Sequence, residues 1–252
     1  MEGKNVIDII QKKTINAENS KIILGFPEVG LVGTIASMFL VETLKMEEVG
    51  YFRSPLFPPL IILHKGKPSF PVRIYSHDKI FLILSEIPIP PAAMFPLSAK
   101  IVNWAKENKA DIILMIGGLP VPNRMDLETP EVFAAVCGEK AEKIVEQLQI
   151  KKLEEGMMVG PYAAIFMECY NSDVNALLLS AQAFARYPDP GAAASVVTIL
   201  SKILDVDLDI KPLLERAEEL RIRLRDLMRT TSQTMARMGK SQEHGIPPMM
   251  YV

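Results

Sequence analysis

A glycine-punctuated turn near residue 30 has the residue types that commonly bind phosphate. It runs Gly25-Phe26-Pro27-Glu28-Val29-Gly30-Leu31-Val32-Gly33, between an apolar run and a stretch with helical spacing. Backbone N–H groups at the start of a helix attract anions. However, the turn lacks the lysine of a nucleotide-binding P-loop, and Glu28 stands where a dinucleotide-binding turn has glycine. We therefore expect Gly30 and Gly33 to let a helix pack closely on a sheet.

A second candidate site is a ligand crevice formed by Gly30, Glu86, Gly117 and Arg124. Glu86 and Gly117 each follow an apolar run with strand character. Because α/β folds bind ligands at the carboxyl ends of parallel strands, these residues could outline a pocket for an anion or a sugar. The alternative interpretation, which the sequence favours, is a tight turn, a solvated carboxylate and a surface arginine.

The last six residues, Pro247-Pro248-Met249-Met250-Tyr251-Val252, have the composition of a docking peptide. Chain termini are usually polar and disordered, whereas this one is apolar and aromatic. A receptor could capture the terminal carboxylate of Val252, while Tyr251 supplies a flat anchor with one hydroxyl. The two prolines keep the approach extended, so that less entropy is lost on binding. The alternative is that the tail folds back onto its own core.

The sequence shows no catalytic or metal-binding constellation. The histidines lack metal-ligand spacing (His64, His77 and His244). Cys169, which follows Glu168, is a weak candidate nucleophile, and neither it nor Cys137 has a histidine nearby in sequence. The serines considered lack the Gly-x-Ser-x-Gly elbow of hydrolases (Ser37, Ser98 and Ser195). We therefore expect no enzymatic activity, no metal and no cofactor.

Composition narrows the class of protein. A chain of 252 residues with 49% hydrophobic residues can bury a large core. A formal net charge of -2 argues against nucleic-acid binding, which usually needs a basic surplus. No apolar stretch is long enough to span a membrane, no secretory signal opens the chain, and two distant cysteines do not suggest a disulfide framework. These features predict a reduced, cytoplasmic protein.

The order of apolar runs and turns predicts an α/β fold with a mainly parallel sheet flanked by helices. The expected strands are 21–26, 49–52, 60–64, 70–75, 80–85, 111–116 and 132–136, and the expected helices are 31–45, 96–108, 139–149 and 190–204. The strands 60–64 and 70–75 should form a hairpin, and Gly117-Gly118 should end a strand. No assignment follows for 157–170, while 175–184 fits a strand or a helix.

A long helix with a narrow apolar stripe is predicted after Asp209. Apolar or small residues recur in alternating steps of four and three, a heptad pattern formed by Leu213, Ala217, Leu220, Leu224, Leu227, Thr231, Thr234 and Met238. The stripe fits packing on one partner helix, and packing on its own domain is the alternative. The expected organisation is an α/β domain at 1–206, a helical extension at 207–239 and a flexible tail at 240–252.

Three segments resemble the proteasome assembly chaperone family, in its archaeal branch. They are 22–33 (IILGFPEVGLVG), 117–120 (GGLP) and 187–194 (YPDPGAAA), and their order and spacing match over nearly the whole chain. Glu28 departs from the family, whose members commonly carry glycine there. The resemblance implies a fold like that of nucleoside phosphorylases and related hydrolases, without established catalysis. It also implies homo-oligomers, with tetramers or pentamers expected.

The resemblance extends to the tail. Some archaeal members resemble proteasome activators that end in a hydrophobic residue, tyrosine and any residue, and Met250-Tyr251-Val252 matches this pattern. In activators such tails enter pockets between α-subunits of the proteasome core, where a lysine pairs with the terminal carboxylate. The resemblance therefore predicts a homo-oligomer that docks its tails into the α-ring. The alternative is a ligand-binding protein or enzyme that uses the crevice of Gly30, Glu86, Gly117 and Arg124.

Overall fold

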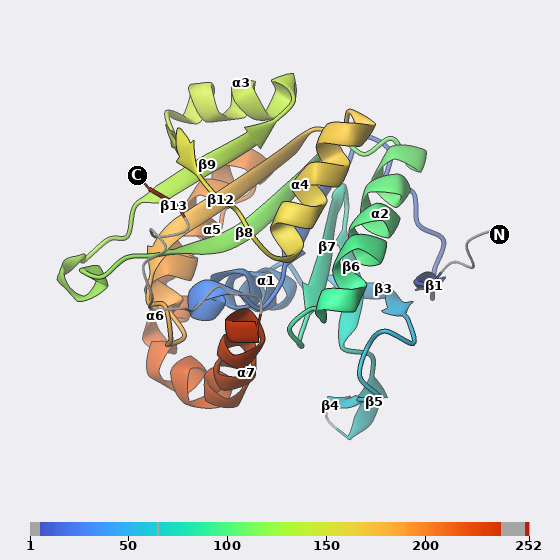
Figure 1. Cartoon of the computed structure of the whole chain (residues 1–252), viewed down its shortest axis with the longest axis horizontal. Helices are drawn as coiled ribbons and strands as arrows, with labels where there is room; N and C mark the ends of the chain where they lie inside the picture. The colour runs from blue at the N-terminus through green and yellow to red at the C-terminus, as the bar shows by residue number, and fades with distance from the viewer. Residues whose placement is uncertain (1–5, 65, 238–249, 252) are drawn as a thin grey trace.

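The computed structural model describes residues 6–64, 66–237 and 250–251 (Figure 1). Its helices are η1 (Val29–Leu31), α1 (Val32–Thr43), α2 (Pro91–Glu107), η2 (Arg124–Asp126), α3 (Glu139–Leu148), α4 (Pro161–Ser172), α5 (Pro190–Leu204), α6 (Lys211–Glu215) and α7 (Ala217–Arg237). Its strands are β1 (Asp8–Gln11), β2 (Lys21–Gly25), β3 (Glu47–Arg53), β4 (Ile62–His64), β5 (Lys67–Ser69), β6 (Val72–His77), β7 (Ile80–Ser85), β8 (Ile112–Pro120), β9 (Val132–Cys137), β10 (Lys151–Lys152), β11 (Glu155–Gly156), β12 (Ala176–Ala183) and β13 (Met250–Tyr251).

A nine-stranded sheet forms the centre of the molecule, in the order β1-β3-β6-β7-β2-β8-β12-β9-β10. The four central strands, β7, β2, β8 and β12, run parallel, and antiparallel strands flank them on both sides. The chain leaves β2 toward the β7 side and returns through β8 on the other side. The carboxyl end of β2 is therefore a topological switch point, where α/β sheets commonly place ligands.

Helices cover both faces of the sheet. Successive residues of β2 point to opposite sides, so that Ile23 packs with α1 and α5 while Ile22 and Leu24 pack with α2 and α4. The four central strands are buried on both faces, which explains their continuous apolar runs. These features confirm the α/β fold expected from the sequence, with a parallel centre and antiparallel flanks.

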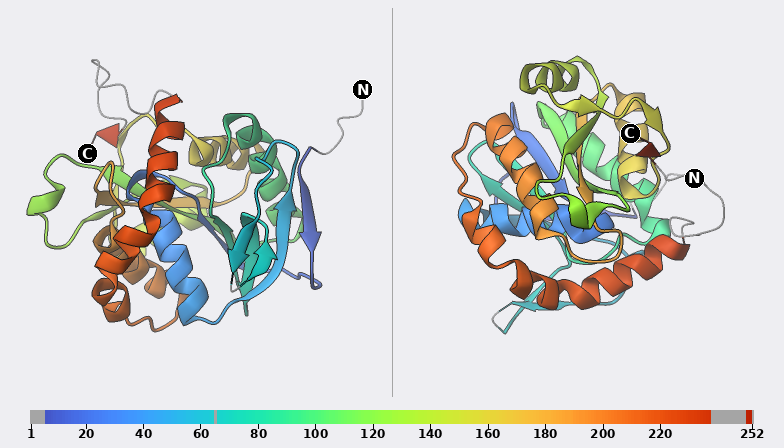
Figure 2. Two further views of the ribbon diagram at one scale, coloured as in Figure 1. Left: turned by 90° about the horizontal axis from the view of Figure 1, so that it is seen from below. Right: turned by 90° about the vertical axis from the view of Figure 1, so that its left-hand side faces the viewer.

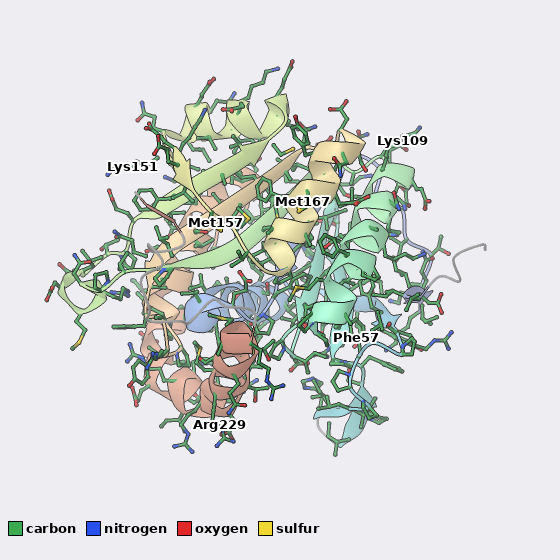
Figure 3. All side chains as sticks on the ribbon, viewed as in Figure 1. Phe57, Lys109, Lys151, Met157, Met167 and Arg229 are labelled. Carbon is green, nitrogen blue, oxygen red and sulfur yellow. The ribbon has the colours of Figure 1, made fainter. Side chains whose placement is uncertain are left out.

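The long helix α7 packs on its own subunit. Its buried side chains, Leu224, Met228, Thr231 and Met235, lie on one stripe, and the apolar ones belong to the same core as α1 and α5. Figure 2 shows α7 running along one side of the molecule, and Figure 3 labels Arg229 on its outward-facing side. Of the predicted stripe, Ala217, Leu220, Leu227 and Thr234 are only partly buried, because the helix faces a broad core rather than a single partner helix. Met238 lies outside the described residues.

Three sequence predictions about local structure were wrong. The segment 60–64 pairs with β5, within a short hairpin that projects from the body, whereas β6 joins the main sheet between β3 and β7 (Figure 1). The helix predicted at 96–108 begins at Pro91, since proline is tolerated in a first turn. Gly117 and Gly118 lie inside β8 and pair with β12, because a long neighbouring strand extends the ladder past them.

The sequence also left some elements unassigned. Residues 8–11 form an edge strand that had no predicted counterpart, since four residues without clear alternation give little signal. The undecided segment 157–170 contains most of α4, and 175–184 is the strand β12. The division of the chain at residues 206 and 239 stays a prediction.

Candidate functional site

The carboxyl ends of the central strands meet at a buried ion pair between Arg124 and Asp189. Arg124 donates from Nε to Oδ2 of Asp189 at 2.7 Å and from Nη2 to Oδ1 at 2.9 Å. The side chain of Asp189 is fully buried, and that of Arg124 is 9% exposed. Arg124 also donates to the carbonyl oxygen of Leu127 and packs over the ring of Phe184. All these contacts are internal, so the guanidinium is committed to structure.

Asp189 connects three further parts of the chain. Its carboxylate accepts a hydrogen bond from the N–H of Ala192 at 3.0 Å, which makes it the N-cap of α5, and another from the N–H of Phe184 at 3.1 Å. Its own N–H donates to the carbonyl oxygen of Gly30 at 2.8 Å. Asp189 thus holds together η2, the end of β12 and the start of α5 through its carboxylate, and the turn after β2 through its backbone N–H.

Glycines in this region allow close backbone approach. Gly30 has a φ of +62°, a backbone conformation in which a residue with a side chain would be strained. A Cβ on Gly118 would lie 2.5 Å from the carbonyl oxygen of Val29, and one on Gly33 would lie 2.5 Å from that of Ile116. Gly33 therefore lets the start of α1 pack closely on β8, as the sequence analysis expected, whereas Gly30 faces Ala183 and Asp189.

Tyr162 closes the same region from the other face of the sheet. Its hydroxyl has one hydrogen, which points between the carbonyl oxygens of Ile116 at 2.7 Å and Leu24 at 3.1 Å, and its oxygen accepts from the N–H of Phe26 at 2.9 Å. Burial, with a smaller contribution from Glu28, raises the pKa of Tyr162 well above its usual value, while its backbone hydrogen bonds act in the opposite direction. The phenol stays protonated and ties β2 to β8.

A separate cavity of about 580 Å³ lies between α1, the β6–β7 hairpin and the α6–α7 segment. It is lined by Arg73 and Tyr75 of β6, by Glu86 just after β7, and by apolar residues of α1 and α7. Arg73 pairs with Glu86, and Nε2 of His64 lies 3.1 Å from the same carboxylate. Burial raises the pKa of Tyr75 to about 12, although Arg73 opposes this shift, so Tyr75 is neutral at ordinary pH.

The structure distributes the four predicted crevice residues over three environments. Gly30 and Arg124 both contact Asp189, and Gly117 faces Ser180 and Tyr162 inside the sheet. Glu86 lies in the cavity beside Arg73. The sequence analysis missed Asp189, Tyr162 and Arg73 as organising residues. The available signal for Arg73 was its position as the charged residue inside the apolar run 70–75. A charged side chain is almost never fully buried without a partner, so this position indicates an ion pair.

The described part of the tail is the two-residue strand β13. Strand β13 pairs antiparallel with β11, with Tyr251 opposite Glu155 and Met250 opposite Gly156. Both residues of β11 are exposed, and Met157, labelled in Figure 3, follows them directly. Val252 and the segment 238–249 lie outside the described residues. The docking role of Met250, Tyr251 and Val252 stays a prediction.

The candidate nucleophile Cys169 is buried in the core. Burial, with smaller contributions from Cys137 and Glu168, raises the pKa of Cys169 to about 12. Over 6–64, 66–237 and 250–251, no group of three His, Cys, Asp or Glu side chains is placed to hold a metal ion. In the same part of the chain, no helix combines the length and apolar character needed to cross a bilayer. His244 lies outside the described residues.

The chain is similar to proteins from several microorganisms. It matches the PAC2 family over residues 22–228. An uncharacterised protein of Methanocaldococcus jannaschii is 27% identical over 236 residues, which cover 93% of this chain and 94% of that protein. The matched family span includes 22–33, 117–120 and 187–194 and ends within α7, so the tail lies beyond it.

Two solved structures from Pyrococcus furiosus have the same fold. PbaA, an archaeal homologue of proteasome-assembly chaperone, is 30% identical with a TM-score of 0.84, covering 92% of this chain and 99% of that one. PbaB, an archaeal proteasome activator, is 22% identical with a TM-score of 0.73, covering 89% of this chain and 99% of that one. The buried network around Asp189 lies within a fold that both proteins share.

Proposed function

Because the chain belongs to the PAC2 family, we propose that it is a proteasome-associated binding protein, acting as an assembly chaperone or an activator-like factor. The observation that carries the proposal is the similarity, at 30% identity over 92% of this chain, to a homologue of a proteasome-assembly chaperone. Fold alone does not define function, so the binding role must rest on a particular segment of the chain. The tail is the segment with the right chemistry.

In this proposal the tail docks into pockets of the proteasome α-ring. Met250 fills an apolar groove, Tyr251 packs and hydrogen-bonds, and Val252 supplies the carboxylate that a pocket lysine captures. The pairing of β13 with β11 involves two residues on each side. A receptor that offers its own hydrogen bonds can replace so short a ladder at low cost.

A single tail should bind weakly, since ordering a segment on binding offsets much of its contact energy. Several tails on one homo-oligomer, a tetramer or a pentamer, would raise the apparent affinity through effective concentration. The gain requires that the spacing of the tails matches the spacing of the pockets. The oligomer is therefore as important to this function as the final three residues.

A binding role agrees with how the candidate catalytic groups are used. Arg124 is held by Asp189, and Cys169 is a buried thiol whose pKa is raised to about 12. Neither is available for chemistry on a substrate. A small-ligand role is the second candidate, and the cavity beside Arg73 and Glu86 favours it.

The test is a pull-down of proteasome core particles by the full chain. Deleting residues 250–252 should abolish capture and leave the oligomer and the fold intact, because the docking atoms are removed and the body is unchanged. A matched pair is Tyr251→Ala against Tyr187→Ala, since Tyr187 is 69% exposed elsewhere on the body. Capture that survives the deletion, with normal size by light scattering, would overturn tail docking.

A further inference from the structure

The strand β11 (Glu155–Gly156) is an exposed place on the body where an extended chain can add a strand. Among the described strands it pairs only with β13, and both of its residues are exposed. It lies in the connection between β10, the last strand of the main sheet, and α4 (Figure 1). An exposed strand with unpaired backbone N–H and C=O groups is a template for pairing with another chain segment.

The segment that pairs with β11 is the chain's own tail. Tyr251 stands opposite Glu155, and Met250 stands opposite Gly156, in an antiparallel ladder. Hydrogen-bonded and non-hydrogen-bonded pairs alternate in such a ladder, so one of the two tail residues directs its backbone N–H and C=O groups toward β11. The ladder therefore occupies two of the three residues that carry the proposed docking role.

The residues that follow β11 are apolar, as a seat for an apolar tail requires. Met157 comes directly after the strand and is 61% exposed, and Figure 3 labels it. Met158 and Val159 are half-buried, and all three line a small crevice that also contains Gly118 of β8. An apolar side chain left open beside a ladder can be buried by the segment that adds to the ladder. The tail thus pairs with β11 at the end of the sheet where the family segments meet.

The tail is tethered close to this seat. Twelve residues, 238–249, separate the end of α7 at Arg237 from Met250. A segment of this length spans at most about 40 Å when it is fully extended. Such a tether keeps the tail at an effective concentration on the order of millimolar near its own body. A two-residue ladder too weak to form between separate molecules can therefore form within one chain.

We propose that β11 and Met157 form an internal binding place for the tail, and that this closed state competes with docking. The proposal rests on the docking role of Met250, Tyr251 and Val252. The same residues cannot lie on β11 and in a foreign pocket at once. The apparent affinity of the tail for a pocket is therefore reduced by the fraction of tails that are open. The body thereby regulates the segment that it presents to the proteasome.

A disulfide cross-link in the full-length protein tests the closed state without any proteasome. Glu155→Cys is combined with Tyr251→Cys, because residues directly opposite in a ladder have Cα atoms within disulfide reach. The control combines Glu154→Cys with Tyr251→Cys, since a shift of one residue turns the side chain to the other face. Under mild oxidation, the first pair should form an intrachain disulfide about tenfold or more faster than the second. Equal rates, or a disulfide that only joins two chains on a non-reducing gel, would overturn the proposal.

Proteasome capture then tests the competition. Replacing Glu155 and Gly156 together by proline removes every N–H that β11 can donate to the ladder. This variant should bind core particles about threefold or more tightly than the natural chain, whereas Glu154→Pro, outside the ladder, should bind within about twofold of it. Both variants should keep the Tm, because all three residues are exposed. Deleting 250–252 from the double-proline variant should abolish its capture.

The two experiments separate this proposal from the proposed function. Capture that depends on the tail but is unchanged by the two prolines would overturn the competition and leave tail docking intact. Capture that persists after deletion of 250–252 would overturn tail docking, and the competition with it. In that case the cross-link still decides whether the tail lies on β11.

Discussion

Arg124 and Asp189 lie 65 positions apart in sequence and form a two-point ion pair with distances of 2.7 and 2.9 Å. Asp189 belongs to segment 187–194 and also binds the backbone of Gly30, in segment 22–33. Gly118, from segment 117–120, packs against Val29 of the same turn. The three segments that carry the family resemblance therefore meet in space. Contacts among these segments hold together the junction of β2, β8, β12 and α5.

Replacing one partner of the buried ion pair should be strongly destabilising. Arg124→Met should lower the free energy of unfolding by about 3–5 kcal/mol, because it leaves the carboxylate of Asp189 buried without its countercharge. Chemical denaturation measures this change. The control is Arg53→Gln, which breaks the exposed pair with Asp8 and should cost less than about 1 kcal/mol. Equal losses in the two variants would contradict a structural role for Arg124.

The approach of the glycine turn to β8 should tolerate no side chain at Gly118. Gly118→Ala should cost about 1–3 kcal/mol or more, since its Cβ would meet the carbonyl oxygen of Val29 at 2.5 Å and backbone must move. Gly66→Asn is the control: Gly66 has φ +77° but no atom near its Cβ, and asparagine tolerates that conformation. Thermal unfolding compares the two. An unchanged Tm for Gly118→Ala would refute the close approach.

The packing of α7 predicts that substitutions on its buried face lower stability much more than substitutions on its exposed face. Met228→Ala should destabilise the protomer by about 2–5 kcal/mol, because Met228 is 2% exposed in the core shared with α1 and α5. Ile222→Ala, on the exposed face, should change stability by no more than about 0.5 kcal/mol. Denaturation and light scattering are measured together. Loss of an oligomer by Met228→Ala, without loss of protomer stability, would instead favour a seam between copies.

Cys169 should be almost inert toward alkylation at pH 8. A pKa of about 12 leaves about one part in ten thousand of the thiol ionised at that pH, and the thiolate is the reactive form. Because the pKa is raised, reactivity should increase as the pH rises toward 12. Mass spectrometry after brief iodoacetamide treatment follows Cys169 in the native and unfolded protein. Native labelling at pH 8 as fast as in the unfolded chain would restore Cys169 as a candidate nucleophile.

Hydrophobic periodicity and turn chemistry were sufficient to predict most of the strands and helices. Apolar runs at 21–26, 80–85 and 111–116 predicted buried strands, and the helix predicted at 190–204 is α5. These signals are local, since they depend on residues a few positions apart. The same reasoning misplaced the partner of 60–64 and the end of β8, because strand pairing depends on neighbours that are distant in sequence.

The sequence by itself determined the fold class, the family and the chemistry of the final residues, since each depends on residue types in a fixed order. Only the tertiary structure decided what the charged residues do. From the sequence alone, Arg124 and Glu86 were both candidates to line a pocket for an anion or a sugar. Folding placed Arg124 against the buried Asp189 and left Glu86 beside Arg73 in an open cavity. The physical reason is that burial and long-range pairing set the energy of a charge, and both arise only when distant segments meet.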